Sequence, residues 1–280
     1  MDKQLLKDDP LKLSNDGKLS FFFVGIGSAF SKLHYQTNLL IVKNNDHLLV
    51  DCGTVCPTAL WKYQSNITNI NNILVTHSHA DHIGGLEEAA LMGRYVLKKK
   101  VNIVVTDEYK NYLWENSLKG GCSFGERTAD GKYMEFEDYF VHIRPEHIEG
   151  KSNRFYEVNI GSINVKLFRT MHIPDCARSW EDSFFSYGCL VDDKIVFTSD
   201  TRFDPELLKY LEKEYKIEWI FHDCQLFPGG VHAAYSELKT LSSAVKKKMF
   251  LCHYGDNFGA FDPKSDGFAG FADQGCFYKF

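Results

Sequence analysis

Three histidines and one aspartate fall within six positions of this chain, in the stretch His77-Ser78-His79-Ala80-Asp81-His82. Imidazole nitrogens and carboxylate oxygens are the ligands that zinc and similar divalent ions take in proteins. Side chains on an extended segment alternate in direction, so His77 and His79 can converge on one ion. Asp81 and His82 stand at the turn into the next helix, where they can reach a second ion. The spacing therefore predicts a metal centre rather than a polar loop with chance histidines.

Four residues cannot complete two coordination spheres, so further ligands must come from elsewhere. Candidates stand at the ends of expected strands, where an α/β scaffold presents its functional groups. His172 follows the apolar run 163–168, Asp200 follows the run 194–198, and His253 follows the run 249–252. Each of them alone is more often a surface or capping residue. Together with the hexapeptide they form a candidate ligand set.

Short apolar runs alternate with helical patterns along the whole chain. Strands are expected at 19–24, 38–42, 47–50, 72–76, 101–106, 155–160, 163–168, 187–191, 194–198, 217–221 and 249–252. Helices are expected at 57–63, 86–97, 108–118, 205–215 and 236–247. This order predicts an α/β fold, with two mixed sheets packed face to face and helices on the outer faces. We expect a single domain over 1–280, with an excursion from the core at 119–151.

The composition is that of a soluble globular protein, with 44% hydrophobic and 25% charged residues. A net charge of −5 argues against a broad nucleic-acid-binding surface. The segment 1–18 has no apolar secretory signal, and no apolar run is long enough to cross a bilayer. The eight cysteines show no paired zinc-ribbon spacing. We therefore expect reduced thiols and a cytoplasmic location.

The order of these donors resembles that of the metallo-β-lactamase superfamily. The motif 76–82 is followed by a lone histidine, by Ser199-Asp200-Thr201 and by a strand-end histidine, and Asp51-Cys52-Gly53 is similar to the superfamily's Asp-x-Gly element. The resemblance covers nearly the whole chain. It implies an αββα sandwich that binds two divalent metal ions. Zinc is the first candidate, and the ligands are also compatible with Mn²⁺ or Fe²⁺.

The resemblance also implies a role for each donor. The implied ligands are His77, His79 and His172 for the first ion, Asp81, His82 and His253 for the second, and Asp200 as a bridge between them. Asp81 counts among the catalytic residues as well as the ligands. Asp51 would orient ligand imidazoles through hydrogen bonds.

Three positions select among the branches of the superfamily. The β-lactam-cleaving zinc enzymes usually carry cysteine where this chain has Asp200, and flavo-diiron oxygen reductases carry glutamate where it has His79. A bridging aspartate with a full histidine set resembles the hydrolase branches, particularly the phosphodiesterases. Gly25 to Phe30 is similar to the opening loop of the tRNase Z branch.

Asp223 and His232 resemble the paired acidic and histidine elements of that tRNase Z branch, in which the histidine assists the leaving group and the acidic residue holds it. Here Asp223 replaces the more usual glutamate, and Ala233 replaces a small hydroxyl residue. His232 is thus a candidate general acid. The alternative is a polar residue at a helix start.

The expected substrate is small. The segment 119–151 is rich in acidic residues and does not resemble the Gly- and Lys-rich arm of tRNase Z, and a polyanionic RNA needs Lys and Arg contacts. The chain is therefore similar to compact relatives of tRNase Z that open cyclic nucleotides, among them the phage anti-Pycsar proteins, which are homodimers. This resemblance implies a homodimeric phosphodiesterase with no membrane partner, in which a hydroxide held by both ions attacks phosphorus.

Three alternatives stay open at this point. One is a tRNA 3′-processing endonuclease, which would bind structured RNA. Another is a thioesterase or lactonase, and the third is a binding protein that has lost its activity. The aromatic end of the chain, 266–280, is either a packed strap or a lip on which a nucleobase stacks.

Overall fold

The structure is a computed structural model that describes residues 1–152 and 154–280. The described chain forms two compact units. The first unit comprises Met1–Gly25, Asn38–Pro145 and Gly275–Phe280, and the second comprises Ile26–Thr37 and Glu146–Gln274. Each unit contains one eight-stranded sheet with parallel and antiparallel pairs. The predicted α/β class with two mixed sheets is confirmed.

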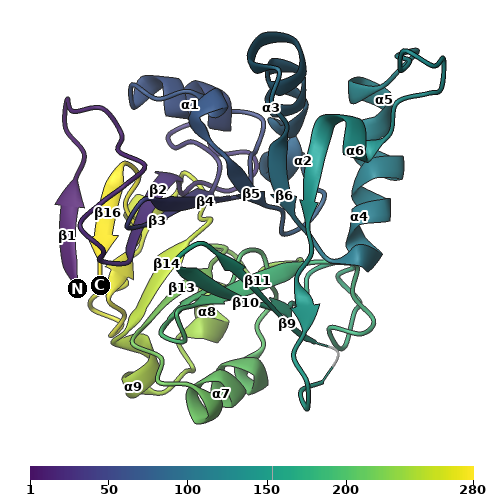
Figure 1. The fold of residues 1–280 in the computed structure, drawn as a ribbon. Coiled ribbons are helices and arrows are strands. Elements are labelled where there is room, and N and C mark those ends of the chain that lie inside the picture. Colours follow the sequence, from purple (N-terminus) through teal and green to yellow (C-terminus); the bar gives the residue numbers. More distant parts are fainter. Residues whose placement is uncertain (153) are drawn as a thin grey trace. The chain divides into compact units, whose positions relative to one another are not determined.

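The sheet of the first unit has the strand order β1-β16-β2-β3-β4-β5-β6-β7. Its strands are β1 (Asp2–Leu5), β2 (Ser20–Gly25), β3 (Asn38–Lys43), β4 (Asp46–Val50), β5 (Asn72–Leu74), β6 (Val101–Val104), β7 (Phe140–Ile143) and β16 (Cys276–Lys279). Strands β2 to β4 are antiparallel, and β4 to β7 run parallel. β1 pairs with β16, which brings the two termini side by side (Figure 1).

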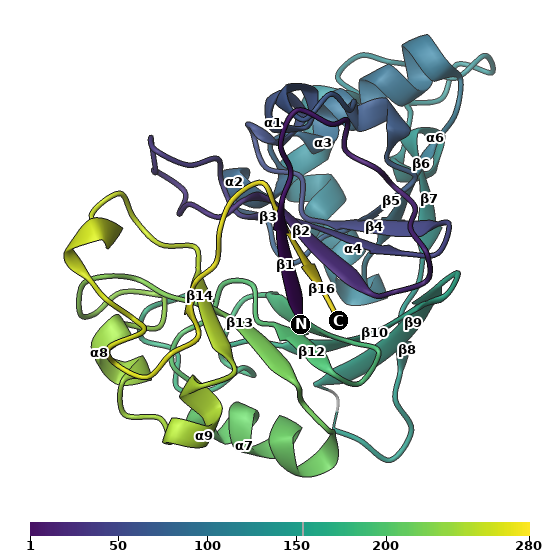
Figure 2. The same cartoon turned by 90° about the vertical axis from the view of Figure 1, so that its left-hand side faces the viewer.

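Helices of the first unit connect these strands. They are α1 (Cys56–Lys62), α2 (Ala80–Ile83), α3 (Leu86–Leu91), α4 (Asp107–Leu113), α5 (Lys119–Cys122) and α6 (Phe136–Tyr139), with the 3₁₀ turn η1 (Ile67–Asn69) and the π-helical turns η2 (Met92–Leu97) and η3 (Trp114–Leu118). α1 and α3 lie on one face of the sheet (Figures 1 and 2). Leu86, Ala89 and Ala90 bury the apolar side of α3, as the helical spacing predicts.

The sheet of the second unit has the order β15-β14-β13-β12-β11-β10-β9-β8. Its strands are β8 (Glu146–His147), β9 (Phe155–Ile160), β10 (Ile163–Arg169), β11 (Tyr187–Val191), β12 (Ile195–Phe197), β13 (Trp219–Asp223), β14 (Met249–Cys252) and β15 (Gly270–Phe271). Its helices are α7 (Pro205–Glu214), α8 (Tyr235–Leu238), α9 (Ser243–Lys246) and the 3₁₀ turn η4 (Phe258–Ala260). α7 and α9 lie on one face of this sheet (Figure 2). Strands β12, β13 and β14 are parallel neighbours, so their carboxyl ends meet at one edge.

The structure differs from the sequence expectations in three respects. The structure also contains β1, β7, β8, β15 and β16, which were not predicted. These strands are short and take their pairing from neighbouring strands. The helix expected at 236–247 is divided into α8 and α9 because Ser242 caps a new helix, accepting a hydrogen bond from the backbone N–H of Val245. The segment 119–151 includes α5, α6, β7 and β8, so part of it belongs to the sheets. The single domain stays a prediction.

No helix within the described residues is long and apolar enough to span a membrane.

Candidate metal centre

The donors of the first unit lie between the carboxyl end of β5 and helix α2. His79 immediately precedes α2, and Asp81 and His82 lie within it. Nε2 of His77 lies 3.0 Å from Nδ1 of His79. Oδ2 of Asp81 lies 3.2 Å from Nε2 of His82. The ligand atoms of a tetrahedral zinc ion are about 3.3 Å apart, so each pair has the separation of two ligands that share an ion.

Asp51, at the end of β4, holds this segment in place. Its carboxylate accepts hydrogen bonds from the backbone N–H of Thr76 (2.8 Å), the Thr76 hydroxyl (2.7 Å) and Nδ1 of His82 (2.7 Å). The Thr76 oxygen in turn lies 3.1 Å from Nδ1 of His77. Burial raises the pKa of Asp51, while His82 and Thr76 lower it. The δ nitrogens of His77 and His82 are therefore engaged within the protein, which leaves their ε nitrogens to bind a metal.

Replacing Asp51 with asparagine is expected to weaken metal binding by about 10- to 100-fold, the range found when hydrogen-bond partners of metal ligands are removed. An amide cannot accept all of the hydrogen bonds that the carboxylate accepts from Thr76 and His82. Competition with a chelating dye would measure the change. Asp107→Asn is a matched control, since Asp107 is an exposed carboxylate paired with Arg144. Equal metal affinity in the Asp51 variant and the wild type would contradict this account.

The donors of the second unit follow strands β10, β12 and β14. Oδ2 of Asp200 lies 3.8 Å from Nε2 of His172 and 3.6 Å from Nε2 of His253, and all three side chains are buried. His253 has a φ of 61°, in the left-handed region that non-glycine residues seldom adopt. Ser199, next to Asp200, has a φ of 49°. Such backbone conformations are concentrated at functional sites, and here they occur where the chain turns at the strand ends.

His172 is held in the form that binds metals. Its Nδ1 donates a hydrogen bond to the carbonyl oxygen of Val231 (2.9 Å), so Nε2 faces Asp200. Burial lowers the pKa of His172 to about 4, although Asp200 acts in the opposite direction. A neutral imidazole is the form in which histidine binds a divalent ion through a ring nitrogen.

Asp223, the last residue of β13, lies between two histidines. Its Oδ2 accepts hydrogen bonds from Nδ1 of His232 (2.8 Å) and from the backbone N–H of Thr201 (2.9 Å). Its Oδ1 lies 3.3 Å from Nδ1 of His253. One fully buried carboxylate thus positions both imidazoles by their δ nitrogens, and their ring centres are 4.8 Å apart.

The charge state of His232 follows from this contact. Burial lowers its pKa, but the carboxylates of Asp223 and Asp200 raise it by more, so the pKa lies above its ordinary value. Burial raises the pKa of Asp223, and the two histidines outweigh that effect and lower it. His232 can therefore carry a proton next to the ligand candidates Asp200 and His253.

The structure brings the predicted residues together within each unit: His77, His79, Asp81 and His82 in the first, and His172, Asp200, Asp223, His232 and His253 in the second. Within the second set, donor atoms of Asp200, Asp223, His232 and His253 all lie within 4.8 Å of one another. Nitrogen and oxygen donors of this kind are typical of zinc and similar divalent ions. The donor chemistry therefore fits a divalent metal.

Hydroxyl groups near the donors were missed by sequence reasoning. Thr76 and Thr201 each lie beside a proposed ligand. Thr76 contacts Asp51 through its hydroxyl, whereas Thr201 contacts Asp223 through its backbone N–H. The Thr198 hydroxyl accepts a hydrogen bond from the backbone N–H of Asp223 (2.9 Å). Thr76 and Thr201 could have been found from the sequence, because they are the immediate neighbours of His77 and Asp200. The contact of Thr198 depends on the pairing of β12 with β13 and has no signal in the sequence.

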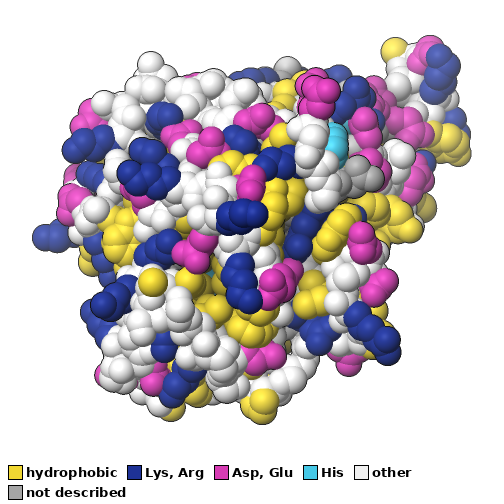
Figure 3. Space-filling view, turned by 90° about the horizontal axis from the view of Figure 1, so that it is seen from below, with side chains coloured by type: hydrophobic (Ala, Val, Ile, Leu, Met, Phe, Trp, Pro, Cys, Tyr) yellow, Lys and Arg dark blue, Asp and Glu magenta, His cyan; other side chains and the backbone are white. Residues whose placement is uncertain are grey.

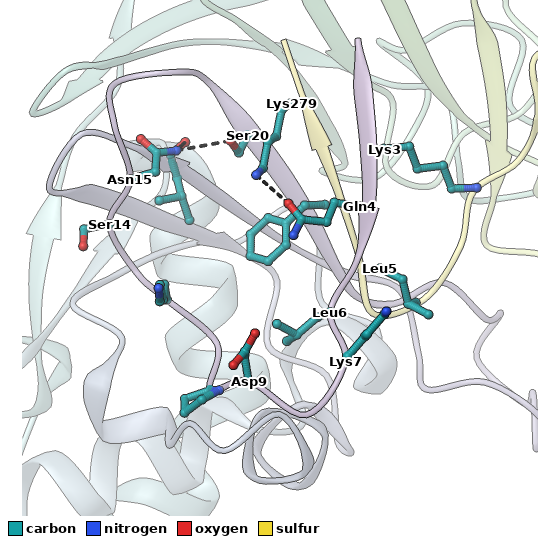
Figure 4. Close-up of a pocket in the computed structure, with 14 residues that line it drawn as sticks. Lys3, Gln4, Leu5, Leu6, Lys7, Asp9, Ser14, Asn15, Ser20 and Lys279 are labelled. Atoms are coloured by element: carbon teal, nitrogen blue, oxygen red, sulfur yellow. Dashed lines mark hydrogen bonds between the residues drawn. The ribbon is translucent and has the colours of Figure 1, made fainter.

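A different kind of cavity lies beneath the N-terminal segment of the first unit (Figure 4). It has a volume of about 580 Å³, and its lining includes Lys3, Lys7, Lys12 and Lys279. Lysine ammonium groups are donors only and do not bind cations. Lys279 is occupied by a hydrogen bond to Gln4 (2.6 Å). This cavity is therefore not a metal site.

Comparison with known proteins identifies relatives over most of the chain. The sequence model of the family described as "Anti-Pycsar protein Apyc1" matches residues 19–278. The anti-Pycsar protein Apyc1 of Bacillus phage BSP38 is 39% identical over 259 residues, which cover 91% of this chain and 96% of that protein. The protein of the same name from Bacillus phage 010DV004 is 40% identical over 262 residues, with the same coverage of both chains.

Solved structures with little sequence similarity share the fold. A diphosphatase of the PhnP family has a TM-score of 0.65 at 14% identity and covers 94% of this chain and 98% of its own. Human tRNase Z, short form, has a TM-score of 0.56 at 18% identity, with 85% of this chain and 93% of its own covered. YhfI from Bacillus subtilis, a metallo-β-lactamase fold protein, has a TM-score of 0.64 at 14% identity and covers 94% of this chain and 100% of its own. The predicted metallo-β-lactamase fold is confirmed.

Proposed function

This chain belongs to the anti-Pycsar protein Apyc1 family, and from that premise we propose that it is a metal-dependent phosphodiesterase that opens a cyclic nucleotide. The proposal keeps the substrate class that the sequence resemblance implies. It also keeps the ligand assignment that the resemblance implies, in which the histidine and aspartate donors hold two ions.

The observation that carries the proposal is the pairing of His232 with Asp223. Asp223 accepts a hydrogen bond from Nδ1 of His232 at 2.8 Å, which directs Nε2 of His232 away from the carboxylate. The ring of His232 lies 5.0 Å from that of His172 and 4.8 Å from that of His253, both proposed ligands. A proton donor next to the ligands suits a reaction whose leaving group is a poorly stabilised alkoxide.

In the proposed reaction the bound ions, the ligands, His232 and Asp223 each have a separate role. Two bound divalent ions supply Lewis-acid stabilisation of the phosphate charge and activation of a water molecule. The chain's own part is to hold them through His77, His79, His172, Asp81, His82, His253 and Asp200. The oxygen of that water molecule forms a new bond to phosphorus and its proton passes to solvent. As the bond between phosphorus and the ribose 3′-oxygen breaks, Nε2 of His232 gives its proton to that 3′-oxygen. Asp223 stabilises the imidazolium beforehand and keeps Nε2 directed toward the leaving group.

The same proton donor argues against a thioesterase. A thiolate leaves without help because thiols are far more acidic than sugar hydroxyls, so a thioesterase gains little from a general acid. A lactonase would share the alkoxide leaving group. The family relationship favours the phosphodiesterase over it.

The first unit offers little support for binding a large RNA. Basic side chains near the acidic segment are paired with its carboxylates, as in Lys110–Glu137, Lys119–Glu135 (3.6 Å) and Lys132–Asp130 (2.8 Å). Basic and acidic side chains are also interspersed over the face in Figure 3. An RNA backbone requires lysine and arginine charges that are not already neutralised. This supports a small substrate over a structured RNA.

The test is hydrolysis of a panel of cyclic mono-, di- and trinucleotides by the metal-loaded protein, with a 3′-extended tRNA beside them. We expect opening of a cyclic mononucleotide to the 5′-monophosphate, and loss of this activity on adding a chelator. Trimming of the tRNA with every cyclic nucleotide untouched would overturn the proposal in favour of the endonuclease. Reconstitution with Zn²⁺, Mn²⁺ and Fe²⁺ in the same assay would test zinc as the preferred ion. The cytoplasmic location and the homodimer stay predictions.

A further inference from the structure

A second cavity, in the second unit, has the size and the walls of a nucleobase site. Its volume is about 400 Å³, within the range of roughly 300–1,000 Å³ that small-molecule sites occupy. Its lining includes the aromatic residues Phe227, Tyr235 and Phe261, together with Pro228, Lys239 and Asp266. The ring centres of Tyr235 and Phe261 are 5.1 Å apart, and Tyr235 is buried. Phe227 is 63% exposed, so its face is open to a flat ligand.

One loop joins this cavity to the proposed general acid. Residues 226–232 leave the sheet after Gln225 and return to it at Ala233, where the backbone N–H of Gln225 donates to the Ala233 carbonyl (2.9 Å). The side-chain amide of Gln225 donates to the carbonyl of Phe227 (3.0 Å) and to that of Gly229. The side chain of Gln225 therefore stabilises the loop through hydrogen bonds to its backbone. Phe227 lies near the start of the loop and His232 at its end.

The far arm of the same loop contacts a proposed metal ligand. The carbonyl of Val231 accepts the hydrogen bond from His172. The end of the loop, at Val231 and His232, thus lies at the proposed catalytic residues, and its start, at Phe227, lines the cavity. A nucleotide likewise carries its base and its phosphate on two sides of one ribose.

We propose that this cavity binds the nucleobase of the substrate, stacked on Phe227 and Phe261. The inference rests on the proposed function, because it assigns the base of a nucleotide whose phosphate lies at His232. It also gives a role to Phe227, an exposed apolar side chain that the reaction itself does not use.

The polar groups at the cavity indicate a base-tolerant site. Nζ of Lys239 lies 2.8 Å from Oδ1 of Asp266, and the hydroxyl of Tyr235 donates to Oδ2 of Asp266 (2.6 Å). Because these groups already form hydrogen bonds and an ion pair with one another, they are poorly placed to recognise the edge of a particular base. Stacking on aromatic rings accepts every base because each has a π face. Purine and pyrimidine nucleotides should therefore both bind.

The experiment compares the affinity of the metal-loaded protein for CMP, AMP and ribose 5-phosphate, which lacks a base. Base stacking makes us expect both nucleotides to bind at least about fivefold more tightly than the sugar phosphate. In Phe227→Ala this advantage should fall by at least about fivefold for both nucleotides, while the affinity for ribose 5-phosphate stays the same. Calorimetry measures all three without requiring turnover.

Trp61→Ala is the matched control, because Trp61 is a 68% exposed aromatic residue of α1 that does not line this cavity. An unchanged base advantage in both Phe227→Ala and Phe261→Ala would overturn the inference. Because the readout is binding, that failure is distinct from failure of the proposed function, which would appear as intact cyclic nucleotides in the hydrolysis panel.

Discussion

Asp200→Ala is expected to lose at least about a thousandfold in turnover of a cyclic nucleotide, together with bound metal. The carboxylate of Asp200 lies 3.8 Å from Nε2 of His172 and 3.6 Å from Nε2 of His253, so it would be within reach of ions held by these two proposed ligands. Its removal would take away a proposed ligand and a negative charge that would balance the bound ions. Metal content by elemental analysis and turnover at saturating substrate measure the two effects.

A control is needed to distinguish loss of metal from loss of folding in Asp200→Ala. Asp200 is buried, so Asp200→Asn, which keeps the shape of the side chain, should accompany the alanine variant. Asp182→Ala removes an exposed carboxylate of the same unit and should leave both metal content and turnover unchanged. Full metal occupancy with normal turnover in a folded Asp200→Asn protein would remove Asp200 from the centre.

His232→Ala should behave differently, with turnover lowered by about 10²- to 10⁴-fold and metal content retained. The side chain is held by Asp223 and protonates the leaving oxygen in the proposed reaction, but it is not one of the proposed ligands. Loss of a general acid raises the barrier only where the leaving group needs a proton. The rate of cleavage of a substrate with an acidic leaving group should therefore change little in His232→Ala.

Bis(p-nitrophenyl) phosphate makes this distinction measurable, since p-nitrophenolate leaves without protonation. We expect His232→Ala to cleave it at a rate near that of the wild type while cyclic nucleotide opening is slow. Asp223→Asn should slow cyclic nucleotide opening too, because an amide does not stabilise the imidazolium of His232 as the carboxylate does. Equal slowing of both substrates in His232→Ala would indicate a role in the metal centre rather than in proton transfer.

Much of the fold was predictable because its central strands carry strong local signals. β3 and β4, for example, are apolar runs of ordinary strand length, and α3 keeps its apolar side at helical spacing. β15 and β16 could not be predicted in this way. They are short strands at the C-terminal end, and they form because β14 and β2 present backbone groups for pairing. The aromatic end of the chain is thus partly a packed strap, with Phe268 buried against Tyr235.

The candidate metal donors could be proposed from the sequence for a related reason. Residues 77–82 are close neighbours in the chain, so their approach to one another requires only a strand end and one helical turn. Asp200 and His253 could be proposed because each directly follows an apolar strand. Residue type and order alone were enough to identify a candidate ligand set, and their pattern was enough to suggest the superfamily.

Which nitrogen of each histidine is available was decided by the tertiary structure alone. Asp223 can hold Nδ1 of both His232 and His253 only because β12, β13 and β14 run parallel and bring their carboxyl ends to one edge. Likewise, Asp51 engages Nδ1 of His82 from a strand that pairs with β5. The sequence by itself determined the types of donors and the ends of strands on which they stand. Their hydrogen-bonded orientation, and with it the difference between a ligand and a proton donor, depends on contacts between residues far apart in the chain.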